Sequence, residues 1–423
     1  MKKYLPRLVD RLLDNKLKGK GAVLIQGPKW CGKTTTAEQK AGSVIYMDEP
    51  ERKEQNIQLA DISPSTLLEG ETPRLIDEWQ IAPKLWDAVR FAVDHRSGKG
   101  QFILTGSSVP AEISEISHSG TGRFAWLTMR NMSLFESGES TGEVSIKDLF
   151  EGKQTINGTN SFDIYQLAYL VCRGGWPDIL DLEEEIALEA AHDYLDGVVN
   201  SDISRVDDTS RDPERARRIM RSYARNQGSQ ISYTKIAEDI SANGLHFSDE
   251  TVASYIKALK RIFVVEDMPS WNPNLRSKKS IRTTDTRYFS DSAIAAAALG
   301  VGPKDLIADL NTFDLLFETM CIRDLRVYAE NLNGSVYHYR DRSGLECDAV
   351  VHLRNGNYGL IEIKLGGDRL INDGASNLIK LESIINMDKM NAPSFKMVLT
   401  GTDRYAYRRP DGVLVVPVGC LRD

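Results

Sequence analysis

The chain has 423 residues, which is enough for about two to four domains of ordinary size. Hydrophobic residues make up 41% of it and charged residues 27%, a balance that is typical of globular protein and excludes a chain disordered throughout. The 53 Lys and Arg residues against 60 Asp and Glu residues give a formal charge of −7. This acidic balance argues against a protein that binds polyanions over its whole surface, although it leaves room for a local basic patch.

The first segment and the cysteines bear on cellular location. MKKYLPRLVDRLLDNKLKGKG has the charges of a signal peptide but no apolar core behind them. No apolar run approaches the ~20 residues that span a bilayer. The cysteines are scattered, odd in number and without a CxxC pair, which argues against a disulfide framework or a cysteine zinc site: Cys31, Cys172, Cys321, Cys347 and Cys420. The sequence therefore predicts a soluble, cytoplasmic protein that does not contact membranes.

A phosphate-binding loop is predicted near the N-terminus. The apolar run 22–25 predicts a buried strand, and Gly27, four further residues and Gly32-Lys33-Thr34 follow it. Glycines in this pattern let backbone N–H groups close around phosphate oxygens, and the next helix adds its partial positive charge. We expect Lys33 to reach the β- and γ-phosphates of ATP and the Thr34 hydroxyl to ligate Mg²⁺. The loop residues expected to bind nucleotide are Gly27, Pro28, Lys29, Trp30, Cys31, Gly32, Lys33, Thr34 and Thr35.

Two acids follow the next apolar strand, in the segment PRLIDEW over residues 73–79. We expect Asp77 to hold the magnesium ion through water, and Glu78 to polarise the attacking water as a general base. The alternative is an acidic surface pair without a function.

A third strand, within residues 101–108, ends in small polar residues. A hydroxyl at its end would lie between the phosphate loop and the acids and could sense the γ-phosphate, and Thr105 and Ser107 are the candidates. The alternative is an ordinary loop.

Arg123 follows a glycine-containing stretch and precedes a predicted strand over residues 124–129. It is a candidate arginine finger, acting in its own chain or in a neighbouring subunit. Equally, it could pair with an acid of its own domain.

Six segments resemble, in order along nearly the whole chain, a family of prokaryotic AAA-type predicted ATPases: YLPRLVD, GPKWCGKTT, RLIDEWQ, FILTGSS, GTGRFAWLTMRNMSLFESGES and CRGGWP. The resemblance implies a Walker A motif over residues 27–34, Walker B acids at Asp77 and Glu78, and a finger position at Arg123. It also implies a lid residue facing the nucleotide at Arg173, although the GGWP turn after it could be structural. Members carry a C-terminal domain of unknown function that resembles restriction endonucleases.

The middle of the chain is predicted to be helical. Residues 151–163 are rich in turn formers and indicate a linker. From residue 218 onward, helices at 232–240 and from Ser248, with strands at 263–265 and 287–289, suggest a winged helix-turn-helix. A loop between those strands carries four cations that could displace counterions from DNA: Arg276, Lys278, Lys279 and Arg282. The alternative is an internal packing module with a solvated basic loop.

The last ~115 residues alternate in an α/β manner. A helix carries Glu318, one strand carries Glu346 and Asp348, and the next carries Glu362 and Lys364. Asp on one strand followed by Glu-x-Lys on the next is the arrangement of restriction-endonuclease-like nucleases. Asp348, Glu362 and Glu318 would then share Mg²⁺, and Lys364 would orient or deprotonate the attacking water. The alternative is a folded relic in which these charges form a salt-bridge network.

Together these observations predict an α/β fold of four units: a P-loop AAA-like core (1–150), a helical lid or linker (151–217), a winged helix (218–304) and a restriction-endonuclease-like domain (305–423). The first hypothesis is an ATP- and Mg²⁺-dependent enzyme that couples nucleotide state to a nuclease-like domain acting on DNA. The second is a nucleotide-dependent signalling switch that binds a protein partner and cuts nothing. An arginine finger acting in a neighbouring subunit would require a homo-oligomer.

Overall fold

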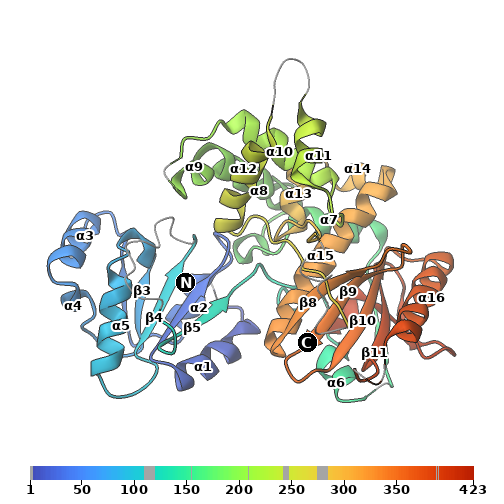
Figure 1. Ribbon diagram of the computed structural model, residues 1–423, viewed down its shortest axis with the longest axis horizontal. Coiled ribbons are helices and arrows are strands. Elements are labelled where there is room, and N and C mark those ends of the chain that lie inside the picture. The colour runs from blue at the N-terminus through green and yellow to red at the C-terminus, as the bar shows by residue number, and fades with distance from the viewer. Residues whose placement is uncertain are drawn as a thin grey trace.

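The computed structural model describes residues 3–108, 120–153, 155–207, 209–241, 247–273, 284–386, 388 and 390–423. Figure 1 shows the N-terminal sheet (blue) and the C-terminal sheet (red) side by side, with the middle helices (green) above them. Over the described ranges, no helix is long and apolar enough to cross a membrane.

The N-terminal unit is built on a parallel sheet with the strand order β2-β3-β4-β1-β5. Its strands are β1 (Ala22–Gln26), β2 (Ser43–Tyr46), β3 (Arg74–Asp77), β4 (Phe102–Gly106) and β5 (Phe124–Thr128). Parallel strands bury both faces, so helices must cover each side. The helices are α1 (Val9–Gly19), α2 (Lys33–Glu38), α3 (Lys53–Ile62), α4 (Pro64–Leu67), the short η1 (Trp79–Ile81) and α5 (Leu85–His95). Apolar residues of α1 pack on one face and those of α5 on the other.

The middle of the chain is helical, as its amphipathic pattern predicts. It contains α7 (Ile164–Arg173), η3 (Pro177–Ile179), α8 (Glu184–Gly197), the π-helical η4 (Val198–Asp202), α9 (Ile203–Arg205), α10 (Pro213–Arg225), α11 (Tyr233–Ile240), α12 (Asp249–Arg261), α13 (Ser292–Leu299) and α14 (Pro303–Ala308). Ser232 and Ser248 cap α11 and α12 by accepting hydrogen bonds from backbone N–H groups. The expected wing strands form isolated antiparallel bridges, Val265 with Phe289 and Met268 with Thr286. The expected basic loop, with Arg276, Lys278, Lys279 and Arg282, lies outside the described residues.

The C-terminal unit has the sheet order β7-β12-β13-β11-β10-β9-β8. Its elements are α15 (Leu310–Asn331), β8 (Gly334–Arg340), β9 (Glu346–Leu353), β10 (Tyr358–Lys364), α16 (Asp368–Ile384), β11 (Phe395–Thr400), β12 (Tyr405–Arg408), β13 (Leu414–Pro417), η6 (Val418–Cys420) and β14 (Leu421–Arg422). Strands β8, β9 and β10 pair antiparallel, and β11 lies parallel to β10 after the crossover through α16. Helix α16 packs on one face of the sheet and α15 on the other.

The segment interpreted as a linker takes part in the C-terminal unit. Strand β7 (Gly158–Thr159) pairs antiparallel with β12. Just before the segment, β6 (Val144–Ser145) is followed directly by α6 (Ile146–Phe150), and β6 pairs parallel with β14. The interpretation of residues 151–163 as a plain linker is therefore wrong, because backbone groups of β7 complete the edge of a distant sheet.

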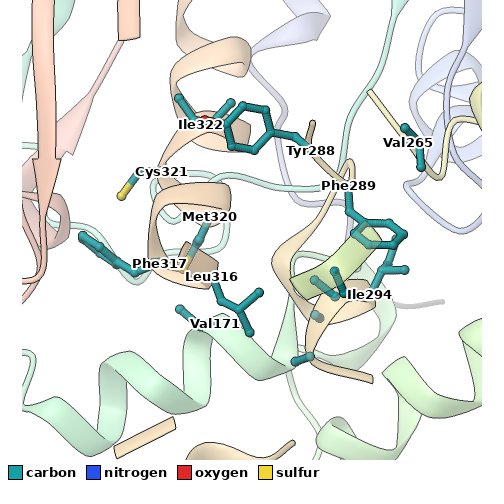
Figure 2. Close-up of a cluster of buried hydrophobic side chains, with 14 of the residues drawn as sticks. Val171, Val265, Tyr288, Phe289, Ile294, Leu316, Phe317, Met320, Cys321 and Ile322 are labelled. Carbon is teal, nitrogen blue, oxygen red and sulfur yellow. The ribbon is translucent and has the colours of Figure 1, made fainter. Parts of the chain in front are cut away.

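The middle helices and the C-terminal unit share one hydrophobic core. Figure 2 shows part of it, where Val171 of α7, Phe289 and Ile294 lie around the α15 residues Leu316 and Met320. The same cluster continues into the C-terminal sheet. Because burial of apolar surface is what stabilises each unit, a shared core makes the two a single folding body.

Candidate functional site

The phosphate loop begins directly after β1 and ends at the start of α2. Gly27 has φ +155°, and a Cβ there would lie 1.9 Å from the Met129 carbonyl oxygen, so only glycine fits. Gly32 has φ +96° and immediately precedes α2. The Lys33 ammonium donates to the Pro28 carbonyl oxygen at 2.7 Å, inside the curve of the loop.

Asp77 ends β3 next to the loop. Its Oδ1 accepts hydrogen bonds from the Thr34 hydroxyl at 2.7 Å and from the Thr105 hydroxyl at 2.5 Å. Burial raises the pKa of Asp77, and these two hydrogen bonds oppose that rise. A hydroxyl beside one carboxylate is the oxygen donor set that Mg²⁺ uses together with waters and nucleotide phosphates, so Thr34 and Asp77 fit that ion.

Glu78 is held in the left-handed backbone region, with φ +51°. Its Oε2 accepts a hydrogen bond from the Ser107 hydroxyl at 3.2 Å and another from the Gln80 side-chain amide. Burial raises the pKa of the Glu78 carboxyl, while the nearby Lys33 charge lowers it. The structure thus gathers Thr34, the two acids and the β4 hydroxyls at one edge of the sheet. Gln80 ends the RLIDEWQ segment that carried the family resemblance, which is the signal in the sequence that could have found it.

Arg123 lies at the amino ends of the parallel strands, whereas the phosphate loop and the acids lie at their carboxyl ends. Its carbonyl oxygen accepts from the Gly21 N–H, before β1, whereas the phosphate loop follows β1. The five-residue strand β1 separates the amino end from the carboxyl end by about 16 Å, at ~3.3 Å per residue. The exposed guanidinium pairs with Asp94, with Nε 2.8 Å from Oδ1. The expectation of a finger acting in its own chain is therefore wrong, and the pairing with an acid of its own domain is found. A role in a neighbouring subunit stays a prediction.

Arg173, the expected lid residue, is buried and points elsewhere. Its Nη1 pairs with Glu139 at 2.5 Å, and its guanidinium lies over the Tyr169 ring at 5.7 Å. Among the described residues, its hydrogen bonds and ion pair go to Gly174 and Glu139 and not to the phosphate loop. Glu139 thus holds the Arg173 guanidinium in this arrangement, and a role of Arg173 toward the nucleotide stays a prediction.

The turn that follows Arg173 reaches the loop instead. The Trp30 indole Nε1 donates to Asp178 Oδ2 at 2.8 Å, and its ring centroid lies 6.1 Å from that of Trp176. Lys29 Nζ lies 2.7 Å from Asp202 Oδ1, in the π-helical turn η4. The two non-glycine residues at the tip of the loop are therefore tied to the middle helices.

Arg7 supports the loop from the other side. Its Nη1 donates to the Cys31 carbonyl oxygen at 2.8 Å, and its Nε pairs with Glu136 at 3.1 Å. Its third contact is from Nη2 to the Arg130 carbonyl oxygen, at 2.9 Å. Arg7 lies in a segment that carried the family resemblance, which is the only signal in the sequence that could have found it.

A buried ion network joins all the units. Asp291 Oδ2 accepts from Asn131 Nδ2 at 2.8 Å, from the Gly175 N–H at 3.1 Å and from Arg323 Nη1 at 3.1 Å. Arg323 also pairs with Asp324 at 2.7 Å. Asp291, Arg323 and Asp324 are each no more than 2% exposed. A Cβ on Gly175 would lie 2.2 Å from the Met132 carbonyl oxygen, so the GGWP turn needs glycine to approach this network.

A second cluster of charges lies on the C-terminal sheet. Lys364 Nζ is 3.0 Å from Asp348 Oδ2 and 2.9 Å from Glu362 Oε2, and the Ile363 N–H also donates to Asp348 at 2.8 Å. Glu362 is 2% exposed, and its Oε1 is buried without a hydrogen-bond partner among the described residues. Glu346 pairs with Arg340 at 3.1 Å, so Asp348 is the acid of β9 that joins this cluster.

Glu318 approaches the same cluster from α15. It accepts a hydrogen bond from the Tyr288 hydroxyl, and burial together with the Asp348 charge raises its pKa to about 8. Burial likewise raises the pKa of Glu362, which Lys364 opposes. Across the described ranges, no three His, Cys, Asp or Glu side chains form a group that could hold a metal ion. The expected three-carboxylate magnesium shell is therefore not assembled in this arrangement, in which the Lys364 ammonium balances Asp348 and Glu362.

The raised pKa of Glu318 predicts a pH-dependent stability. The unfolded chain ionises this carboxyl near its ordinary pKa of 4.5, whereas the folded chain does so only near 8. The protein therefore loses stability as pH rises from about 4.5 to 8, because the unfolded state gains the charge first. Urea unfolding in buffer without divalent cations should show this slope, and Glu318→Gln should reduce it, leaving the part that Glu362 contributes. Glu346→Gln is the matched control, and an equal slope in all three proteins would contradict the prediction.

The N-terminal unit has the features of a P-loop nucleoside-triphosphatase core, with the phosphate loop after β1, acids after β3 and hydroxyls at the end of β4. Comparison with known families agrees: residues 19–137 match the AAA domain family. Residues 164–305 match a domain of unknown function, DUF8612, and residues 313–421 match another, DUF4143. The chain is therefore similar to prokaryotic AAA-type P-loop ATPases that carry a C-terminal domain of unknown function. The AAA domain supports ATP binding and, in general terms, ATPase activity.

Similar whole proteins are known from two mycobacteria. Uncharacterized proteins of Mycobacterium bovis and Mycobacterium tuberculosis are each 23% identical to this chain over 347 residues, covering 81% of this chain and 70% of theirs. Among solved structures, the Walker-type ATPase of Pyrococcus abyssi is similar, with 14% identity and a TM-score of 0.42, over 68% of this chain and 94% of that one.

Proposed function

We propose that the protein hydrolyses ATP at the N-terminal site and that nucleotide state governs the charged cluster of the C-terminal unit, which acts as a nuclease. At the first site the backbone of residues 27–34 binds the phosphates and Lys33 turns from Pro28 to the γ-phosphate. Thr34 and Asp77 hold Mg²⁺, which neutralises phosphate charge when it is bound. Glu78 orients the attacking water and takes its proton. Ser107, which already contacts Glu78, reports on the γ-phosphate.

The nuclease part of the proposal is supported by topology and by chemistry. Helix α15, the antiparallel strands β8, β9 and β10, the crossover α16 and the parallel β11 follow one another, and Asp348 and Glu362-x-Lys364 lie on the neighbouring strands β9 and β10 as the nuclease arrangement requires. Lys364 Nζ on β10 lies within 3.0 Å of a carboxylate oxygen of Asp348 on β9 and of Glu362 on β10. Glu362 Oε1, which is buried and has no hydrogen-bond partner among the described residues, is an acceptor that a divalent cation entering the cluster would satisfy. A cation there would polarise a scissile phosphate, and Lys364 would orient water.

The single observation that carries the coupling is that the middle helices contact both sites. At one end, Asp178 and Asp202 hold the tip of the phosphate loop. At the other end, Tyr288 donates to Glu318 of the charged cluster. Between them, Asp291 accepts a hydrogen bond from the Gly175 N–H and pairs with Arg323, which lies on the same helix as Glu318. A nucleotide that reshapes the loop must therefore shift contacts of a body that shares its core with the C-terminal unit.

The experiment is cleavage of a nucleic-acid panel: supercoiled plasmid, linear duplex, single strand and branched junction. Each substrate is incubated with Mg²⁺ or Mn²⁺, with and without ATP. We expect wild-type cleavage that depends on ATP, and a loss of about 100-fold or more in Glu362→Ala and in Lys364→Ala. Glu346→Ala is the matched control, because Glu346 lies on the same sheet but pairs with Arg340. Cleavage that persists in both cluster variants would reject this nuclease site.

A nucleotide-dependent switch that binds a protein partner is the second candidate. The exposed residues of α12, the second helix of the expected winged helix-turn-helix, are Asp249, Glu250, Ser254 and Lys257, which do not make a cationic face for DNA. Lys260 and Arg261 of the same helix pair with Asp267 and Asp207. If the panel shows no cleavage while ATP turnover is intact, the switch becomes the better account.

A further inference from the structure

A cavity of about 330 Å³ lies where the three parts of the chain meet, away from both charged sites. Its walls come from α1, from β5, from residues 266–269, from α15 and from β8. Both strands are the last in their sheets, β5 in the N-terminal sheet and β8 in the C-terminal sheet. The cavity is thus bounded by two edge strands, of which β8 already pairs through the backbone of His338 with Pro269 and Trp271.

The cavity lining has surplus positive charge, although the whole chain is acidic. Its carboxylates are already engaged: Glu266 and Glu330 both pair with Arg130, at 2.6 and 2.5 Å. The third, Asp267, pairs with Lys260 and Arg287, which lie outside the lining.

Lys16 and Arg354 supply the surplus. Neither has a carboxylate within 4.0 Å among the described residues. Burial and the neighbouring Arg354 lower the pKa of Lys16, although Glu330 opposes this. Two cations that line the same cavity and have no carboxylate within 4.0 Å among the described residues are stabilised by an anionic ligand.

Aromatic rings complete the lining. Trp126 of β5 is 50% exposed, and its ring leans on that of Trp86 at 5.7 Å between centroids. Tyr337 of β8, on the other side of the cavity, is half-buried. An exposed indole ring, with a tyrosine ring and cations in the same lining, suits a planar ring that carries a phosphate. The volume lies within the range of small-molecule sites.

We propose that this junction cavity binds a nucleoside monophosphate, with the base against Trp126 and Tyr337 and the phosphate between Lys16 and Arg354. Such a ligand would contact the N-terminal unit and the C-terminal unit at once. The site is independent of the phosphate loop and does not rest on the proposed function.

The test measures binding of AMP, with inorganic phosphate in parallel, to the full chain carrying Lys33→Ala, so that the phosphate loop is disabled. Quenching of tryptophan fluorescence reports on the cavity through Trp126. We expect saturable quenching by AMP that disappears in Trp126→Phe, and an affinity about tenfold lower or weaker still in Lys16→Gln/Arg354→Gln. Lys147→Gln/Arg408→Gln, which removes two exposed cations elsewhere, is the matched control and should bind AMP as its parent does.

Calorimetric titration keeps the test independent of the fluorescence signal, because it detects AMP in the Trp126→Phe protein as well. Absence of AMP binding to the Lys33→Ala protein would overturn the proposal. Equal affinities for inorganic phosphate and AMP would overturn the assignment of a base to Trp126 and Tyr337. Unchanged AMP affinity in Lys16→Gln/Arg354→Gln would remove the two cations from the site and reject it.

Discussion

Glu78→Gln is expected to leave ATP binding close to the wild-type value and to lower the ATP turnover rate by about 100-fold or more. Glutamine keeps the shape and the acceptor oxygen that Ser107 contacts at 3.2 Å, so the loop and its strand edges should stay in place. It cannot take a proton from water, because its amide is not a base. Steady-state ATP hydrolysis measures the loss, and equilibrium binding of ATP shows that the site remains intact.

Glu54→Gln is the control for this change, because it makes the same change of charge and size at a residue that is exposed on α3. Turnover by the wild-type protein should also fall as pH decreases, because burial raises the Glu78 pKa and only the ionised carboxylate acts as a base. Normal turnover by Glu78→Gln would remove Glu78 from the mechanism and leave water activation to another group.

The nucleotide site could be predicted from the sequence because its signals are local. The spacing from Gly27 to Thr34 directly encodes a turn and a helix start, and each glycine is where the backbone requires one. Thr105 and Ser107 followed from a general rule, since the carboxyl ends of parallel strands meet at one edge of the sheet. The structure brings both hydroxyls to the acids, at 2.5 and 3.2 Å. Their roles in catalysis remain predictions.

The same rule, applied to Arg123, would have predicted that this residue lies away from the nucleotide site. Arg123 precedes β5, and a residue before a parallel strand lies at the amino edge, away from the phosphates. Motif resemblance placed it in the site because it compares positions along the chain and not the edges of a sheet. Arg173 shows the converse, because its neighbours Trp176 and Asp178 reach the loop while Arg173 itself is paired with Glu139.

Long-range pairings had no signal that the sequence could offer. Strand β7 has two residues, too few for any period, and its partner β12 lies more than 240 positions later. Arg323 and Asp324 read as ordinary charges on a helix, yet both are buried. Their burial depends on Asp291 arriving from another element, which no local pattern encodes.

That buried network supports the second large prediction. Asp291→Ala is expected to lower the free energy of unfolding by about 3–5 kcal/mol, the usual cost of breaking a buried ion pair from one side. The change leaves Arg323 with Asp324 as its remaining carboxylate and deprives the Gly175 N–H and the Asn131 amide of their acceptor. Urea unfolding followed by tryptophan fluorescence measures the loss.

Two further variants separate this network from a general effect of mutation. Asp291→Asn keeps an acceptor oxygen for Gly175 but removes the charge, so its loss should be smaller than that of Asp291→Ala. Asp196→Ala breaks the exposed pair with Arg217 and should change stability little. A small loss in Asp291→Ala, equal to that of Asp196→Ala, would contradict the prediction.

If the network also carries the nucleotide signal, Asp291→Asn should bind ATP normally while ATP no longer alters the C-terminal activity, because Gly175 and Arg323 would lose the charge that holds them to one another.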